Sequence, residues 1–158
     1  MSSFARLRGS ERLVPLGDRE IGPTVAIRLR AIALAGFNVG YALAIHGEEP
    51  PALWYVYRLN VQTGKRERFA AGPDGEVEYP NSGGGVEDIA GLADGTVAWT
   101  VAGAPRAPAA REVMEVAGNS SQPTTVTEDS TLETTSLALS PGYLYWFTAS
   151  GPHAQRLP

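Results

Sequence analysis

The feature that most constrains the fold is a short pattern that occurs three times without a gap. The three stretches are "LAGFNVGYALAI" (34–45), "LADGTVAWTVAG" (92–103) and "LSPGYLYWFTAS" (139–150). Each starts with leucine, has turn-forming residues at its third and fourth positions, and then alternates along its length. A period of two is typical of β-strands. Each stretch therefore predicts a β-hairpin, and the recurrence predicts that hairpins are the units of the chain.

The same alternation predicts how these units pack. Tyr41, Trp99 and Trp146 occupy one position of the pattern, whereas small residues such as Ala42 and Ala98 alternate with them. In the first two stretches neither face carries a charge, so both faces are expected to be buried. A sheet with one bulky and one small-residue face can nest against copies of itself. The alternative is a single β-sandwich whose hairpins resemble one another by chance.

Further strand pairs follow or precede these hairpins. The segments 4–17, 52–70 and 109–127 each read as two strands around a turn, and no segment shows a sustained helical period. A period of roughly 40 to 50 residues with several strands per unit indicates a propeller-like array. One domain is predicted over 1–158, with outer strands of a split unit, two complete units and the inner strands of the split unit at 1–16, 17–71, 86–127 and 132–158.

The hairpins, together with the outer pair that bears "LNVQTGKRERF", resemble blades of the β-propeller superfamily. The likeness is to its TolB- and WD40-like repeats, especially the uncharacterised ones of high-GC bacteria, and it covers nearly the whole chain. It implies an all-β fold of antiparallel, four-stranded, blade-like repeats. It implies a fold and a stacking mode, and no reaction.

The predicted number of blades raises a question of closure. The chain supplies about three blades, whereas closed propellers have four to eight. Three solutions remain open: a piece of a longer propeller, two chains that close one ring, or a compact β-sandwich or barrel. The ends favour closure, because the N-terminal outer strands and the C-terminal inner strands complement each other. We expect them to share one sheet, preferably between two chains in a homodimer.

Composition excludes several classes of function. The formal net charge is −4, which argues against nucleic-acid and membrane partners. The chain has no cysteine and two histidines, so thiolate chemistry is excluded, and no metal or other cofactor is expected. The start of the chain lacks the apolar run of a signal peptide. A cytoplasmic location is the default expectation, and a mature secreted fragment is the alternative.

The candidate site residues follow from the resemblance. In propellers, the connections between strands two and three and those between blades share one rim, where ligands usually bind. The residues that this implies for the present chain are His46, Glu48, Glu49, Tyr79, Arg106 and His153. In addition, Arg30 aligns with Asp88 on the predicted innermost strands, where the two would form an inner pair facing a tunnel, as a salt bridge or an ion site.

The sequence lacks the motifs of common enzymes. No nucleophile elbow, phosphate-binding loop or zinc-protease motif is present, and no catalytic residue is assigned. The first hypothesis is a non-catalytic, propeller-type interaction module that contacts a protein or carbohydrate partner through its loop rim. The alternatives are a lactonase- or glycosidase-like hydrolase that uses rim carboxylates, and a purely structural, self-associating protein.

Overall fold

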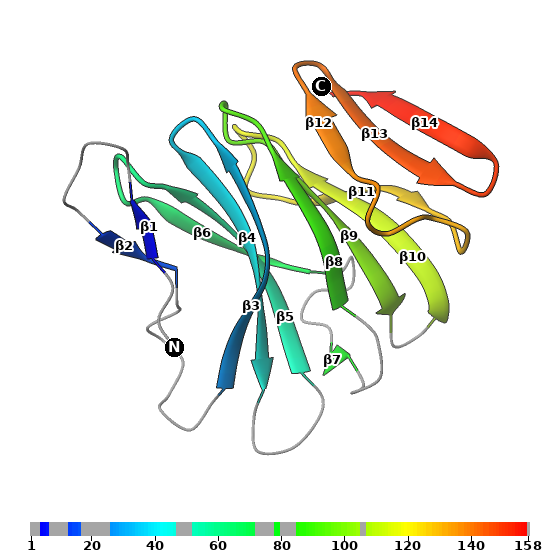
Figure 1. Cartoon of the computed structure of the whole chain (residues 1–158), viewed down its shortest axis with the longest axis horizontal. Helices are drawn as coiled ribbons and strands as arrows, with labels where there is room; N and C mark the ends of the chain where they lie inside the picture. The colour runs from blue at the N-terminus through cyan, green and yellow to red at the C-terminus, as the bar shows by residue number, and fades with distance from the viewer. Residues whose placement is uncertain are drawn as a thin grey trace.

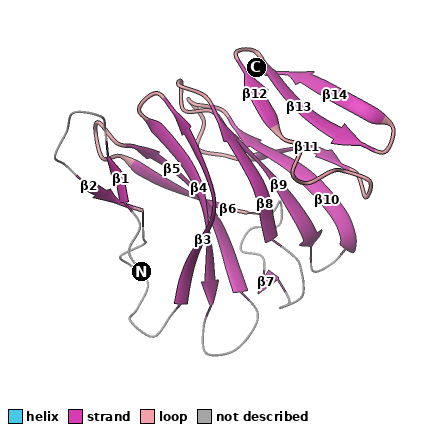
Figure 2. Ribbon diagram, in the orientation of Figure 1, coloured by secondary structure: helices cyan, strands magenta, loops and turns pink. Residues whose placement is uncertain are grey.

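The structure is a computed structural model. It describes residues 4–6, 13–16, 26–46, 52–71, 78–79, 85–104 and 107–157. Within these ranges the regular structure consists of β-strands, without a helix (Figure 2). The same part of the chain accordingly contains no helix long and apolar enough to cross a membrane. The all-β prediction is confirmed.

In the described part of the chain, four antiparallel sheets follow one another (Figure 1). The N-terminal hairpin consists of β1 (Phe4–Arg6) and β2 (Leu13–Pro15). The first large sheet has the order β3 (Ala26–Ala35), β4 (Asn38–His46), β5 (Ala52–Asn60) and β6 (Arg66–Ala70), with β7 (Glu78–Tyr79) also paired to β5. Apart from β7, neighbours in the sheet are thus neighbours in the sequence, as expected for strands joined by short turns.

The second large sheet and the C-terminal sheet have the same plan. The second large sheet has the order β8 (Gly85–Gly91), β9 (Val97–Ala104), β10 (Ala107–Val116) and β11 (Thr124–Glu128). The C-terminal sheet consists of β12 (Ala138–Ser140), β13 (Tyr143–Thr148) and β14 (Gly151–Arg156). The three stretches of the sequence pattern form the β3–β4, β8–β9 and β12–β13 hairpin regions.

Strand pairing corrects the gap-free alignment at one point. Leu34 pairs with Val39 and Leu139 pairs with Leu144, but Val97 pairs with Gly91 and not with Leu92. The β8–β9 turn is therefore longer than the other two, which are tight turns at 36–37 and 141–142. The alignment was wrong on the β8 side of that turn, because a pattern match detects alternation and not the length of a loop.

The sheets stack with the bulky face of each on the small-residue face of the one before it. Trp99 of the second large sheet packs in one cluster with Ala42 and Ala44 of the first. Trp146 of the C-terminal sheet packs in the same way with Ala98 of the second. Tyr41 lies on the opposite side of the first sheet, in a cluster with residues of the N-terminal hairpin. This is the nesting that the alternation predicts, and it makes three successive apolar cores.

The three aromatic residues of the pattern are buried as predicted. Tyr41 and Trp99 are 0% exposed and Trp146 is 6% exposed. The Trp99 indole N–H also donates a hydrogen bond of 2.8 Å to the carbonyl of Ala71, which ties the two large sheets together. Each aromatic side chain thus fills the junction between its own sheet and the preceding layer.

The described sheets form an open stack. The N-terminal hairpin lies at one end and the C-terminal sheet at the other (Figure 1), and they belong to separate sheets. The prediction that the terminal strands share a sheet is therefore wrong within one chain; the exchange between two chains stays a prediction. The C-terminal sheet also has a third strand, β14, beyond the predicted inner hairpin. The described layers outnumber the two of a single β-sandwich.

Candidate functional site

The rim predicted from the sequence is only partly covered by the described residues. His46 is the last residue of β4, and Tyr79 pairs with Ala52 at the start of β5. The backbone of these two residues therefore lies at one end of the first large sheet. Glu48, Glu49 and Arg106 lie outside the described residues. A common binding surface for this set stays a prediction.

His153 has well-defined contacts, and it lies in β14 and not in a loop. Its ring stacks on Trp146 with 5.7 Å between ring centroids. Its Nε2 is 2.8 Å from the hydroxyl of Thr148 and 3.1 Å from that of Ser150. A serine next to a histidine suggests a nucleophile and a base, which a third group must orient. No acid among the described residues hydrogen-bonds to the ring. Asp129 accepts hydrogen bonds from Thr131, which lower its pKa, and the charge of His153 lowers that pKa further.

The inner pair is not formed in the described part of the chain. Arg30 lies over the ring of Trp54, with 5.5 Å between its guanidinium carbon and the ring centroid. The Asp88 carboxylate accepts main-chain hydrogen bonds from Ile89 at 2.9 Å and from Leu137 at 3.1 Å. The pairing registers skip Arg30 in β3 and Glu87 in β8, so Arg30 corresponds to Glu87 and not to Asp88. The gap-free alignment of Arg30 with Asp88 was wrong because the β8–β9 turn is longer than the β3–β4 turn.

The junction between the two large sheets is held by Arg58 of β5, which is 6% exposed. Its guanidinium donates hydrogen bonds to the carbonyl of Gly95 in the β8–β9 turn and to those of Ala117 and Ser120 in the β10–β11 turn, at 3.1, 2.8 and 2.7 Å. It also pairs with Glu67 at 2.7 Å. One cation thus joins the first large sheet to two turns of the second.

At the junction between the second large sheet and the C-terminal sheet, a glutamate, Glu115, holds the position that corresponds to Arg58. Arg58 pairs with Gly40 across the β4–β5 ladder, and Glu115 pairs with Ala98 across the β9–β10 ladder. Because Gly40 and Ala98 hold the same position of the sequence pattern, Glu115 stands in the second large sheet where Arg58 stands in the first. Glu115 faces the C-terminal sheet as Arg58 faces the second large sheet. It is 4% exposed.

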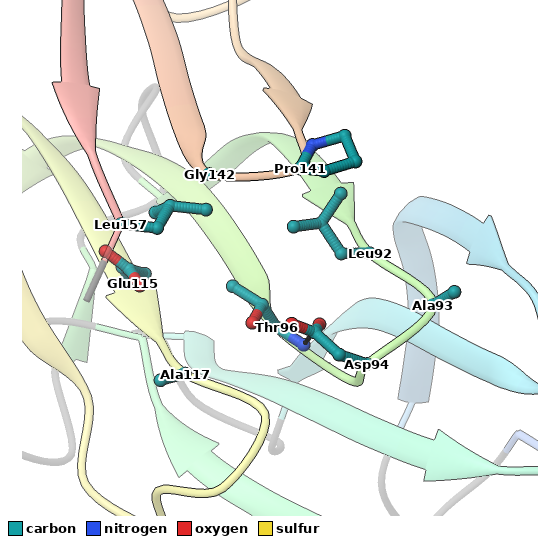
Figure 3. A pocket seen from close by; sticks show the side chains of 9 residues that line it. All are labelled: Leu92, Ala93, Asp94, Thr96, Glu115, Ala117, Pro141, Gly142 and Leu157. Atoms are coloured by element: carbon teal, nitrogen blue, oxygen red, sulfur yellow. Dashed lines mark hydrogen bonds between the residues drawn. The ribbon is translucent and has the colours of Figure 1, made fainter.

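Glu115 lines a cavity of about 280 Å³ between these two sheets. We call it the acidic cleft (Figure 3). Asp94 and Thr96 border it from the β8–β9 turn, and apolar walls come from both sheets, with Leu92, Ala93, Ala117, Pro141, Gly142 and Leu157. The Asp94 carboxylate accepts a hydrogen bond of 2.8 Å from the main-chain N–H of Thr96, which fixes it in the turn.

Burial raises the pKa of the Glu115 carboxyl, and the negative charge of Asp94 raises it further. At the junction between the two large sheets, the pKa of Glu67 shifts in the opposite direction. Its partial burial acts to raise the pKa, but the hydrogen bond and charge of Arg58 outweigh this effect and lower it. The two junctions therefore differ in electrostatics. Glu67 is compensated by Arg58, whereas Glu115 is buried without a cation among the described residues.

The cleft lies at the opposite end of the strands from the predicted rim. Its turns join the first strand of a sheet to the second, whereas the rim holds the connections from the second strand to the third. The described residues include no group of three or more histidine or acidic side chains that could hold a metal ion. Asp94 and Glu115 can instead accept hydrogen bonds from a cation.

The sequence reasoning missed Arg58, Asp94 and Glu115. A signal was present, because Arg58 and Glu115 are charged residues within strands whose neighbours alternate as in a sheet buried on both faces. A charge in such a strand needs a partner or a cavity.

The outer face of the C-terminal sheet is apolar. Tyr143, Tyr145 and Phe147 alternate along β13 and are 45%, 39% and 46% exposed. Tyr145 occupies the position of the sequence pattern that the buried Gly40 and Ala98 hold in the two large sheets. Phe147 occupies the position of the buried Ala42 and Thr100. This face therefore lacks the small residues on which a further sheet could nest in the same way.

No protein-family model, curated protein or solved structure matches the chain. The functional argument therefore rests on the residues themselves.

Proposed function

We propose that the protein is a non-catalytic interaction module of the β-propeller type, and that the two ends of its stack of sheets bind protein. The observation that supports this proposal is the location of the exposed large apolar side chains. In the described part of the chain they lie only at the two ends, with Tyr143, Tyr145 and Phe147 at one, and Leu13, Leu29, Ile32, Leu34 and Phe37 at the other. Exposed apolar patches of this kind mark interaction sites.

The occupant we propose for each end is the other end of a second copy of the chain. At the N-terminal end, the β1–β2 hairpin packs on β4 and β5, whose Tyr41, Tyr57 and Leu59 are buried, while Ile32 and Leu34 of β3 stay exposed. Within the chain, β3 packs against the first strand of the next sheet, β8. The exposed side of β3 offers an apolar surface, with Ile32 and Leu34, to the aromatic face of a partner's C-terminal sheet. With the β1–β2 hairpin of each chain counted together with the partner's C-terminal sheet, two chains would then close a ring of six layers, within the range of closed propellers.

This proposal predicts a dimer with two equivalent contacts, each between a C-terminal and an N-terminal end. Analytical ultracentrifugation of the full chain is expected to give a mass that depends on concentration and approaches twice 16.7 kDa. Phe147→Asp at one end and Ile32→Asp at the other should each produce monomers. The matched control Gln122→Asp adds the same charge in the exposed β10–β11 turn and should leave the dimer unchanged.

Mixing the two monomeric variants separates this arrangement from a face-to-face dimer. The Ile32→Asp chain keeps an intact C-terminal end and the Phe147→Asp chain an intact N-terminal end, so a mixture should regain one contact and form a heterodimer. A dimer that uses like ends would instead persist in one of the two variants, because each variant keeps one of its ends free of the added charge. A wild-type chain that stays monomeric at high concentration would overturn the proposal.

A second candidate function, hydrolysis, has one observation in its favour. Glu115 has a raised pKa and shares a cleft with a second carboxylate, and acid–base pairs of glycosidases consist of carboxyl groups in different environments. Turnover of aryl glycosides or lactones that is abolished in Glu115→Gln but kept in Glu133→Gln would replace the non-catalytic proposal. We expect no turnover by the wild-type protein.

A further inference from the structure

The acidic cleft contains a buried glutamate whose carboxylate has no partner among the described residues. Glu115 is 4% exposed, and no described residue donates a hydrogen bond to its carboxylate or forms an ion pair with it. Its side chain lines the cavity, which Asp94 borders from the neighbouring turn (Figure 3). An ionised carboxylate that is partly removed from water is costly unless a cation or several donors compensate it. A positive group in the cleft would supply that compensation.

The preceding junction indicates what kind of group fits. There, a guanidinium occupies the space between two sheets, bonds to the carbonyls of the adjoining turns and pairs with Glu67. At the Glu115 junction the β8–β9 turn also contributes an acceptor, the Asp94 carboxylate, but the residue in the place of Arg58 is itself an acceptor. The nearby Arg156 pairs with the exposed Tyr143 across the β13–β14 ladder, and it does not line the cleft.

We propose that the acidic cleft binds an alkylguanidinium group from outside the chain. Its N–H groups bond to Glu115 and Asp94, and its hydrocarbon part lies against Leu92, Pro141 and Leu157. The site lies between two sheets at the level of their turns, away from both end faces. It does not depend on the function proposed above.

Three properties of the cleft favour a guanidinium over other cations. A guanidinium presents donors in a planar fork that can reach two carboxylates, whereas an ammonium is a compact and more strongly hydrated charge. A metal ion would need more ligands than the two acids that line the cleft. The apolar walls suit an alkyl stem, as apolar surfaces near a charged head commonly do. The volume of about 280 Å³ accommodates a group of this size.

The guanidinium can come from a free small molecule or from an arginine side chain of a peptide, and the experiment separates the two. We would titrate the ¹⁵N-labelled full chain with ethylguanidinium chloride, with ethylammonium chloride and with the peptide acetyl-Gly-Arg-Gly-amide, and follow the amide resonances. We expect ethylguanidinium to shift the resonances of Thr96, Ala117 and Gly142, with a dissociation constant on the order of 1 mM. Tighter binding of the peptide would identify a protein-borne arginine, and weaker binding a free small molecule.

The variant Glu115→Gln keeps the shape of the side chain and removes its charge. It should weaken ethylguanidinium binding by at least about tenfold, and Asp94→Asn should weaken it less, because Asp94 is exposed. Glu133→Gln removes an exposed charge elsewhere and should have no effect. The folded state of each variant is read from the dispersion of the same spectra. Equal binding of ethylammonium, unchanged binding in Glu115→Gln, or no shifts at the cleft would overturn the proposal.

Discussion

At the scale of single residues, the two charged side chains buried at the sheet junctions have opposite consequences for stability. Arg58 is surrounded by acceptors and is compensated by Glu67. Glu115 holds the corresponding place in the next sheet and faces a second acid. A buried charge stabilises only when its surroundings compensate it. Arg58 thus joins two sheets, whereas Glu115 weakens the apo protein at neutral pH and equips it for a ligand.

Replacing Arg58 with alanine should destabilise the protein by about 2–4 kcal/mol, because three turn carbonyls and Glu67 lose their donor. The lowered pKa of Glu67 contributes stability above the pKa of an unfolded glutamate, and this contribution is lost as pH falls through the folded pKa. The cost of the substitution should therefore shrink in acid. Urea unfolding at neutral and acidic pH measures both effects, and a cost that is equal at both would contradict the assigned ion pair.

Glu115→Gln should stabilise the ligand-free protein at neutral pH. The raised pKa means that the folded protein holds this proton more tightly than the unfolded chain does. The stability associated with the protonated acid is complete below the unfolded pKa, about 4.3, and is lost as pH rises through the folded pKa. Wild type and variant should thus be equally stable in acid and diverge above it. Glu133→Gln is the control, and urea unfolding across this pH range provides the measurement.

At the scale of elements, contacts between turns help to hold the sheets together, as the strands do. The β8–β9 and β10–β11 turns lie against each other: the N–H of Gly118 donates a hydrogen bond of 3.1 Å to the hydroxyl of Thr96, and Arg58 bonds to both turns. The β8–β9 turn also borders the acidic cleft. The position of these turns therefore decides the geometry of the site.

Gly118→Ala should disturb this pair of turns. A Cβ atom at Gly118 would lie 2.3 Å from the carbonyl oxygen of Asp94, and this backbone atom cannot move without shifting the turn. We expect a loss of about 1–3 kcal/mol, as for overpacking elsewhere, and weaker ethylguanidinium binding through the displaced Asp94. Gly91→Ala is the control, because its Cβ would lie 3.7 Å from its nearest neighbour. Thermal unfolding checks the prediction, and equal stability of the two variants would contradict it.

At the scale of the whole molecule, the stack has apolar surface at both ends, and the N-terminal hairpin covers part of one end. Val14 and Leu16 of this region are 8% and 2% exposed and pack on the first large sheet. The remaining exposed residues of that end and the aromatic face of β13 form the surfaces through which we propose that two chains associate. An open stack thus gives the protein its capacity for contact.

Deleting residues 1–16 should expose the face of the first large sheet that carries Tyr41, Tyr57 and Leu59. Loss of the Val14 and Leu16 contacts should cost about 3–6 kcal/mol. The truncated chain should also bind more of an apolar fluorescent dye and should fail to dimerise. Calorimetry, dye fluorescence and ultracentrifugation measure these three changes. A truncated chain with the parent's mass and melting temperature would contradict the proposed role of this end.

The sequence by itself determined the strands and the way their faces nest, because alternation of Tyr41, Trp99 and Trp146 with small residues is a local property with a period of two. Only the tertiary structure decided the length of the β8–β9 turn, the separation of the terminal strands and the acidic cleft. Asp94 and Glu115 lie far apart in the chain, and neither belongs to a motif. They meet because a turn of one strand pair lies beside the end of another, and whether a buried charge finds a partner depends on packing between sheets, which no local pattern records.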